Sequence, residues 1–275
     1  TLPTAGFVVV SLRRWPSQQS GWWTDLLNNE TWTLDAYRAA LSVSVNNSFV
    51  ESMFNSLAIS LPATLIPLFL GSLAAYAIGW IPFRGKTTLF FGMIALIALP
   101  IQAALIPLLQ AFSGGAHLSL PAIGKTVTLF PDLGLAGKLP AVWLPLVGFA
   151  LPFSIFLLTV AITQLPSSLI DAARADGASH MQVFWRIALP LLTPTLAGLG
   201  VLLFLWSWND YLVGLTMIGG GNPEALPATI RLVAYSVPTG GSAIAAAACL
   251  HSAVSIGVFL VLQRYFARSI VLSAE

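Results

Sequence analysis

Five long apolar segments constrain what this chain can fold into more than any other feature. They run from about Met53 to Ile78, Leu89 to Phe112, Leu139 to Ile162, Leu191 to Gly214 and Ala243 to Tyr265. Each is close to or above the roughly 20 apolar residues that a helix needs to cross a bilayer. Because lipid offers no partners to backbone N–H and C=O groups, a spanning segment must satisfy them internally. The sequence therefore predicts an all-α, polytopic membrane protein.

A sixth apolar stretch, Leu2 to Leu12, is shorter. It has about half the length of a helix that crosses the bilayer. It lacks the basic residues and the small-residue cleavage site that mark a signal peptide. We expect it to be the outer end of a helix whose beginning is missing, which brings the number of transmembrane helices to six.

The composition excludes several classes of function. Only 8% of the residues are charged, against about 25% in ordinary soluble domains. The net charge is +2, and the basic residues form no stripe of the kind that nucleic acid binding needs. The single cysteine, Cys249, lies in an apolar segment, so we expect neither a disulfide nor a metal site.

The polar connectors alternate between the two sides of the membrane. Residues 13–48, 113–138 and 219–242 belong to one side, and residues 79–88 and 163–190 belong to the other. Lys and Arg usually accumulate in cytoplasmic loops. Six of them lie in the first set, and six lie in the second set together with the C-terminal tail, so they do not orient the chain.

Residues 167–190 are the most informative connector. Pro166 and the serines after it indicate a helix start, with Ser168 and Asp171 at the spacing of a capping box. Asp171 would then lie in the first turn, where the helix dipole favours a negative charge. The small side chains of Ala172 and Ala173 allow a partner surface to approach closely.

A second limb follows in the same connector. Gly177 allows a sharp change of direction. Phe184, Ile187 and Leu191 recur at helical spacing, so this limb is expected to lean on the membrane helices, and Pro190 marks the start of the next span. The whole connector predicts a rigid, protruding knob with small side chains, which suits docking to a partner.

The stretch Asp171-Ala-Ala-Arg-Ala-Asp176-Gly177-Ala178 and Phe184 resembles the EAA loop of ABC importer permeases, with Asp171 where that family usually has Glu. The resemblance implies that residues 167–190 form a cytoplasmic coupling loop, and that 13–48, 113–138 and 219–242 are external loops. It implies a bacterial or archaeal cytoplasmic (inner) membrane. The residues implied to receive force from an ATPase subunit are Asp171, Ala172, Ala173, Asp176, Gly177, Ala178 and Phe184.

Further motifs extend the resemblance to carbohydrate-uptake permeases of the maltose and α-glucoside type over nearly the whole chain. They are Asn55-Ser56, Ala74-Ala75-Tyr76, Leu99-Pro100, Ile106-Pro107, Phe149 to Phe153, Trp208-Asn209-Asp210 and Gln263 to Phe266. The insertion from His117 to Leu135 looks like the α-glucoside branch. The implied partners are a second permease subunit, two ATPase subunits that hold ATP and Mg²⁺, and an extracytoplasmic sugar-binding protein.

Two glycine motifs do not encode a nucleotide site. Gly85-Lys86-Thr87 has Trp80 where a phosphate-binding loop needs glycine, and Gly219-Gly220-Gly221 is not followed by Lys and Ser or Thr. We therefore expect no cofactor and no catalytic residue in this chain, which would be a transport subunit and not an enzyme.

Polar and aromatic residues gather near the end of the fifth span: Trp206, Trp208, Asn209, Asp210 and Tyr211. They fit a sugar pathway, because an acid inside a membrane segment is costly and usually functional. They also fit an interfacial aromatic belt around a solvated carboxylate, and both interpretations stay open. His251 is expected to be a hydrogen-bonded core residue, and residues 219–242 to be a flexible loop.

Three other functions compete with sugar import. An ABC permease for amino acids or peptides would carry the same coupling loop. A self-contained secondary transporter would show buried coupling charges and internal repeats, and apart from Asp210 neither is evident. An intramembrane enzyme would need converging nucleophiles, bases or metal ligands, which three scattered histidines do not supply.

Overall fold

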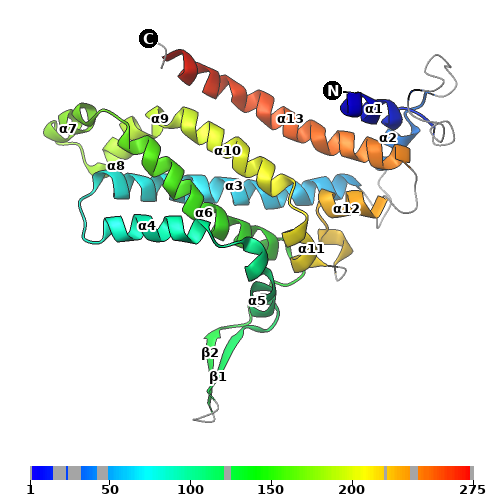
Figure 1. The fold of residues 1–275 in the computed structure, drawn as a ribbon, viewed down its shortest axis with the longest axis horizontal. Coiled ribbons are helices and arrows are strands. Elements are labelled where there is room, and N and C mark those ends of the chain that lie inside the picture. The colour runs from blue at the N-terminus through cyan, green and yellow to red at the C-terminus, as the bar shows by residue number, and fades with distance from the viewer. Residues whose placement is uncertain are drawn as a thin grey trace.

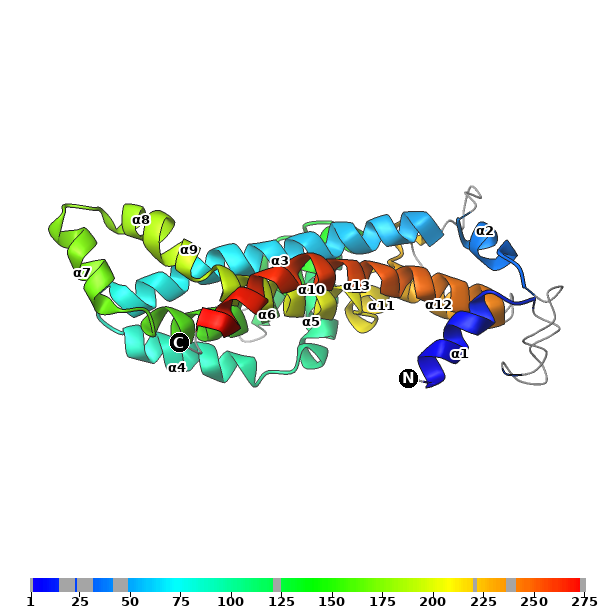
Figure 2. The ribbon, with the colours of Figure 1, turned by 90° about the horizontal axis from the view of Figure 1, so that it is seen from above.

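A computed structural model of the chain describes residues 2–14, 23, 32–41, 49–120, 125–219, 222–235 and 241–272. Its body is a bundle of helices that run along the long axis of the molecule (Figures 1 and 2). The principal helices are α3 (Phe49–Trp80), α6 (Leu139–Thr163), α10 (Thr193–Trp208) and α13 (Gly241–Leu272). α3 packs along α6, and α10 lies against α3 and α13. The predicted all-α architecture is confirmed apart from one two-stranded hairpin.

Three helical segments are long and apolar enough to cross a bilayer: α3, α6 and Gly241–Arg264 of α13. Two bent pairs pass the same test when each pair is taken together, namely α4 (Lys86–Ile97) with α5 (Ile101–Gly114), and His180–Leu191 with α10. The described residues therefore supply up to five crossings. The short sixth element is α1 (Leu2–Ser11), which packs against α13.

The segment predicted to span from Leu89 to Phe112 is sharply bent. α4 and α5 meet at 93°. At the break, Pro100 has extended backbone angles, φ −73° and ψ 129°, and a proline disfavours helical geometry in the residue before it. α4 and α5 are about 18 and 21 Å long at 1.5 Å per residue, so neither alone crosses the roughly 30 Å hydrocarbon core.

The predicted span from Leu191 to Gly214 is also divided. α9 (Leu189–Leu191) leads into α10, and α11 (Leu212–Ile218) follows after a connection that is not helical. Asn209 and Asp210 form this connection together with Tyr211. Their short polar side chains bond to nearby backbone groups, which favours a helix end over a helix interior.

The hairpin lies in the connector between α5 and α6. β1 (Ala116–Leu120) and β2 (Lys125–Phe130) are antiparallel, and they extend away from the bundle beyond α5 (Figure 1). A ring nitrogen of His117 lies 3.3 Å from Oγ1 of Thr128 on the opposite strand. The sequence predicts only an external loop over residues 113–138 at this position.

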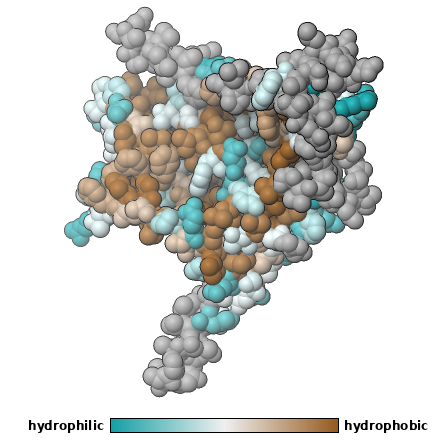
Figure 3. Space-filling model, turned by 45° about the vertical axis from the view of Figure 1, so that its right-hand side comes forward, coloured by the Kyte–Doolittle hydropathy of each residue, from teal (hydrophilic) through white to brown (hydrophobic). Residues whose placement is uncertain are grey.

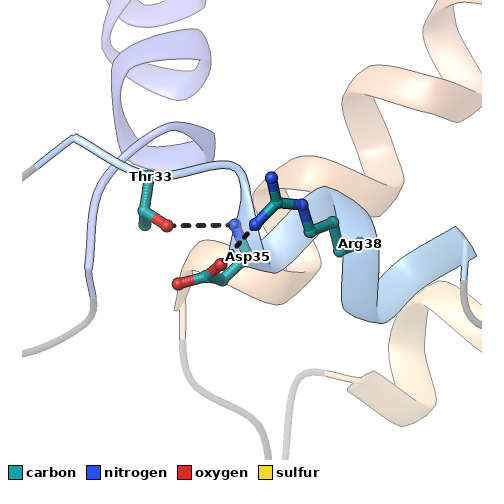
Figure 4. A network of polar contacts seen from close by, with 3 residues as sticks. All are labelled: Thr33, Asp35 and Arg38. Atoms are coloured by element: carbon teal, nitrogen blue, oxygen red, sulfur yellow. Dashed lines mark hydrogen bonds and ion pairs between the residues drawn. The ribbon is translucent and has the colours of Figure 1, made fainter.

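At one end of the bundle, α2 (Asp35–Leu41) packs against α13. The Asp35 N–H donates to Oγ1 of Thr33 at 3.1 Å, and Arg38 pairs with Asp35 at 3.4 Å (Figure 4). Both charged side chains of this pair are well exposed, so water screens their attraction. The predicted external loop over residues 13–48 lies mostly outside the described residues, including Trp15 and Trp22.

Apolar side chains cover much of the face that Figure 3 shows. On α3, the exposed Leu61, Leu65 and Phe69 follow one another at intervals of four residues, which places them on one face. A soluble monomer rarely exposes so extensive an apolar surface. Such a surface suits contact with lipid chains or with another membrane subunit.

Candidate coupling site

The coupling segment, residues 167–190, protrudes at the end of the bundle where α3 ends and α4 begins (Figures 1 and 2). Its first limb is α7 (Ser167–Ala175), which directs Ile170 into the body with 4% of its surface exposed. Asp171, Ala172, Asp176 and Gly177 are exposed, and Ala173 and Ala178 are half-buried. Four of the seven predicted coupling residues thus lie on the outer surface of the segment.

The predicted helix start after Pro166 is confirmed, but the predicted capping box of Ser168 and Asp171 is wrong. Pro166 is the N-cap of α7, no side chain caps the helix, and Asp171 lies beyond the first turn. The capping box lies at α8 (His180–Val183) instead: the Ser179 N–H donates to Oε1 of Gln182 at 2.8 Å, and the Gln182 N–H donates to Oγ of Ser179 at 3.3 Å. The sequence Ser179-His-Met-Gln182 carries this signal.

The predicted turn at Gly177 is confirmed. Gly177 has φ +83°, in the left-handed region that glycine adopts without steric cost. Its N–H donates to the Arg174 carbonyl, and the Ala178 N–H donates to the Ala173 carbonyl, each at 3.0 Å. These two bonds form a Schellman motif, which satisfies the last carbonyls of α7 and fixes the direction of the chain after it.

The second limb packs against the bundle as predicted, but in a shifted register. Phe184 is buried, and its ring lies edge to face on Tyr76 of α3, with centroids 5.5 Å apart. Phe184–Ala188 forms a π-helical turn. Because a π turn holds more residues than an α turn, Leu192 takes the next buried position with 2% exposure, whereas Leu191 is 47% exposed. The expected burial of Leu191 is therefore wrong.

The candidate pathway residues separate into two groups. Trp208 is 1% exposed, and its ring stacks between Phe204 at 5.5 Å and His251 at 4.9 Å. Its indole N–H donates to the His251 carbonyl at 3.2 Å, which joins α10 to α13. Trp206 and Tyr211 are 39% and 37% exposed. Trp208 is therefore a packing residue in this conformation, while Trp206 and Tyr211 lie on the surface.

The expected hydrogen bonding of the His251 ring is not found. Both ring nitrogens are buried without a hydrogen-bond partner among the described residues, and only the backbone carbonyl accepts a bond, from Trp208. Its place in the core, with 6% exposure, agrees with the prediction.

Asn209 and Asp210 hold the connection between α10 and α11. Nδ2 of Asn209 donates to the Leu205 carbonyl at 2.8 Å at the end of α10. The Asp210 carboxylate accepts the Gly214 N–H at 3.0 Å, at the start of α11. The Asp210 carbonyl accepts the Thr229 hydroxyl at 2.7 Å. Asp210 is thus a helix cap and an anchor, while Asn209 remains exposed.

A polar clamp on α3 is the feature that sequence reasoning missed. It holds the α12 segment, residues 222–235, which contains α12 (Ala228–Tyr235) and a 3-10 turn (Pro223–Ala225). Nδ2 of Asn55 donates to the carbonyls of Glu224 at 2.6 Å and Leu226 at 3.2 Å.

Two more contacts complete the clamp. Oγ of Ser56 accepts the Ala228 N–H at 2.8 Å, and Nε of Arg231 donates to Oγ of Ser52 at 3.1 Å. The described part of residues 219–242 is therefore fixed to α3, contrary to the expected flexible loop. The polar residues within an apolar span, Ser52, Asn55 and Ser56, were the available signal.

The sequence pattern of the binding-protein-dependent transport system inner membrane component family matches residues 67–272, which include the coupling segment. The chain belongs to this family. The predicted resemblance of the chain to ABC importer permeases is thereby confirmed, and the chain is a membrane-embedded permease component of a heteromeric ABC transporter.

Two relatives illustrate this membership. The chain is 37% identical to an osmoprotective compounds uptake permease protein of Synechocystis, over 98% of this chain and 85% of that protein. It is 37% identical to an α-glucoside transport system permease protein of Rhizobium meliloti, over 86% of this chain and 59% of that protein.

The fold agrees with that of a solved ABC transporter. One chain of a bacterial transporter involved in the import of the acidic polysaccharide alginate superposes with a TM-score of 0.73, over 96% of this chain and 90% of that one. At 21% identity, the likeness concerns the fold alone.

Proposed function

We propose that this chain is one of two permease subunits of an ATP-driven importer for a sugar or a sugar-based osmolyte. The observation that carries the proposal is the coupling segment: an exposed helix with small side chains, fixed by a Schellman turn and joined to the bundle through Phe184 and Tyr76. An element that receives force needs a rigid outer surface and a rigid connection to what it moves.

An apolar cluster between the coupling segment and the long helices provides the rigid connection. It joins Ile170, Val183 and Phe184 of the segment to Tyr76 of α3 and Ile162 of α6. Close-packed interiors shift as units and do not deform continuously. Displacement of α7 by a partner is therefore passed to α3 and α6 together.

The proposed cycle needs four partners besides the lipid bilayer. A sugar-binding protein delivers the solute at the outer side of a bacterial or archaeal cytoplasmic (inner) membrane, and a second permease completes the pathway. Two ATPase subunits, which hold ATP and Mg²⁺, close on ATP and draw the two coupling segments together at the cytoplasmic side. Each permease then rocks about the shared interface, since ATP favours the outward-open state.

For the substrate, we propose contacts with Trp206, Asn209 and Tyr211. Aromatic rings offer apolar faces to sugar rings, and the Asn209 amide offers hydrogen bonds. All three residues are exposed near the end of α10. The buried Trp208 and the capping residue Asp210 hold this region in place. The names of the two relatives, for osmoprotective compounds and α-glucosides, favour a neutral glucoside. Weak contacts suit a pathway, because a tightly held sugar would not leave.

The test is uptake by the complete complex in proteoliposomes, assembled with its partner permease, ATPase and binding protein. We expect ATP-dependent accumulation of a labelled glucoside, and none when the ATPase is omitted. Uptake by this chain alone under an ion gradient would overturn the proposal. ATP-dependent uptake of amino acids or peptides, without any sugar, would contradict the substrate class and leave the coupling mechanism standing.

A further inference from the structure

The α12 segment is wedged between two long helices. Ala228 is fully buried together with Phe49 of α3 and Ala247 of α13, and Leu232 packs against this cluster. On its other side, the Thr229 hydroxyl bonds to the Asp210 carbonyl. Near its start, Nδ2 of Asn222 donates to the Gly137 carbonyl at 3.1 Å. The segment thus contacts the bundle on several sides.

The polar clamp makes release from α3 costly. Arg231 is only 8% exposed, and its guanidinium reaches both Oγ of Ser52 and the carbonyl of Pro223. A buried charge is tolerated only while its hydrogen bonds are made. Asn55 serves two backbone carbonyls at once. Separation of the segment from α3 would break both bonds of Asn55 and would take the buried guanidinium of Arg231 away from Ser52.

The same helix carries the connection to the coupling segment at its other end. Asn55 lies near the start of α3 and Tyr76 near its end. α3 is one continuous helix of 32 residues, about 48 Å long at 1.5 Å per residue. It stays helical through Pro62 and Pro67, and it packs along α6. Both attachments therefore act on one rigid element.

We infer that Asn55 and Arg231 are positioning residues that make the α12 segment move with α3 as one body. Contact of a binding protein with the α12 segment and contact of an ATPase with α7 then act on opposite ends of the same helix. The part of this inference that concerns the binding protein and the ATPase rests on the proposed function. The joint movement of the α12 segment and α3 does not depend on the proposed function. The joint movement and the transmission between the two partners can therefore be tested separately.

A disulfide across the clamp tests whether the two elements stay together during transport. The native cysteine is first removed by Cys249→Ala, and Ser56→Cys is combined with Ala228→Cys, where the parent residues are in direct contact. We expect the oxidised complex to take up solute at the rate it shows before oxidation. Each single-cysteine variant controls for the oxidant. Loss of uptake on oxidation, with recovery on reduction, would overturn the inference.

Substitutions at Asn55 test whether contact of the binding protein with the α12 segment stimulates ATP hydrolysis through α3. Asn55→Leu removes both donated bonds at similar volume, and Asn55→Asp places an acceptor against two carbonyl oxygens. We expect ATP hydrolysis without binding protein to be unchanged, and its stimulation by loaded binding protein to fall about fivefold or more. Thr216→Val is the matched control, because among the described residues the Thr216 hydroxyl bonds only within α11, to the Leu212 carbonyl.

The outcomes separate the inference from the function it rests on. Unchanged stimulation in both Asn55 variants, or an equal fall in basal and stimulated hydrolysis, would refute the positioning role. Absence of stimulation in the parent complex with every sugar-binding protein offered would instead refute the proposed function. In that case the disulfide experiment would still decide whether α12 and α3 move together.

Discussion

The hydroxyl of Tyr76 lies 3.2 Å from Nδ1 of His180, and the two rings meet edge to face with centroids 6.1 Å apart. Tyr76 lies near the end of α3, and His180 is the first residue of α8. Tyr76 also packs on Phe184, so one side chain contacts the second limb of the coupling segment at two positions. Its polar and apolar contributions can be separated by substitution.

Tyr76→Phe should have a small effect, since it removes one hydrogen bond worth about 1 kcal/mol and retains the ring on Phe184. Tyr76→Ala removes the ring from a buried cluster, at a cost of about 3–5 kcal/mol. We expect uptake per ATP hydrolysed to be nearly normal in the Phe variant and strongly reduced in the Ala variant. Solute uptake and phosphate release, measured in the same proteoliposomes, check this. Equal losses in both would mean that the hydrogen bond dominates.

Substitution of Gly177 should act through backbone conformation. At φ +83°, a residue with a side chain costs roughly 1–2 kcal/mol, whereas Asn visits this region more readily. Apart from its two chain neighbours, no described residue has an atom within 4 Å of a Cβ added at Gly177, so the added Cβ itself meets no steric conflict there. We expect Gly177→Asn to retain much of the uptake and Gly177→Leu to lose it with normal membrane insertion. Unchanged uptake and ATP hydrolysis in the Leu variant would contradict a docking role for the turn.

The two tryptophans near the end of α10 should behave differently. Trp208→Ala empties a buried site between Phe204 and His251, and such a change costs about 3–5 kcal/mol of stability. Trp206→Ala alters an exposed ring and should leave the melting temperature of the complex in detergent nearly unchanged, while uptake shows a raised KM. Measurement of the melting temperature and of the KM for uptake in both variants checks this prediction. A stable Trp208→Ala protein with impaired uptake would place that ring in the pathway after all.

The π-helical turn predicts an asymmetry between two adjacent leucines. Leu192→Ala should destabilise the subunit by about 2–5 kcal/mol, because Leu192 is buried beneath the coupling segment. Leu191→Ala should cost much less, since Leu191 is half exposed. Thermal unfolding in detergent gives the comparison, with each leucine as the control for the other. Reversal of the order would indicate a regular α-helix through residues 184–192.

The apolar pattern predicted the long helices well, because burial in lipid depends mainly on hydropathy and length. α3, α6 and α13 each begin and end within a few residues of the expected span or extend beyond it. Pro100 breaks its span, whereas Pro107, Pro145 and Pro152 lie inside continuous helices. Sequence alone does not separate these cases, because neighbouring groups decide whether a freed carbonyl finds another partner.

In the candidate sites too, local features could be predicted from the sequence, and contacts between distant residues could not. Gly177 could be predicted, since its conformation is local, and so could the burial of Phe184. The clamp of Asn55 on the α12 segment could not, because it joins residues 169 and 171 positions apart. The burial of Trp208 depended likewise on a partner, His251, in the last helix.

The right angle between α4 and α5 also bears on how the subunit occupies the bilayer. A straight helix displaces lipid over little more than its own cross-section, about 10–12 Å wide. α5 turns aside and extends about 21 Å across the direction of the bundle (Figure 1). The subunit is therefore wider on the side of α5 than a count of its crossings suggests, and any neighbour on that side has to fit around a ledge and not against a flat wall.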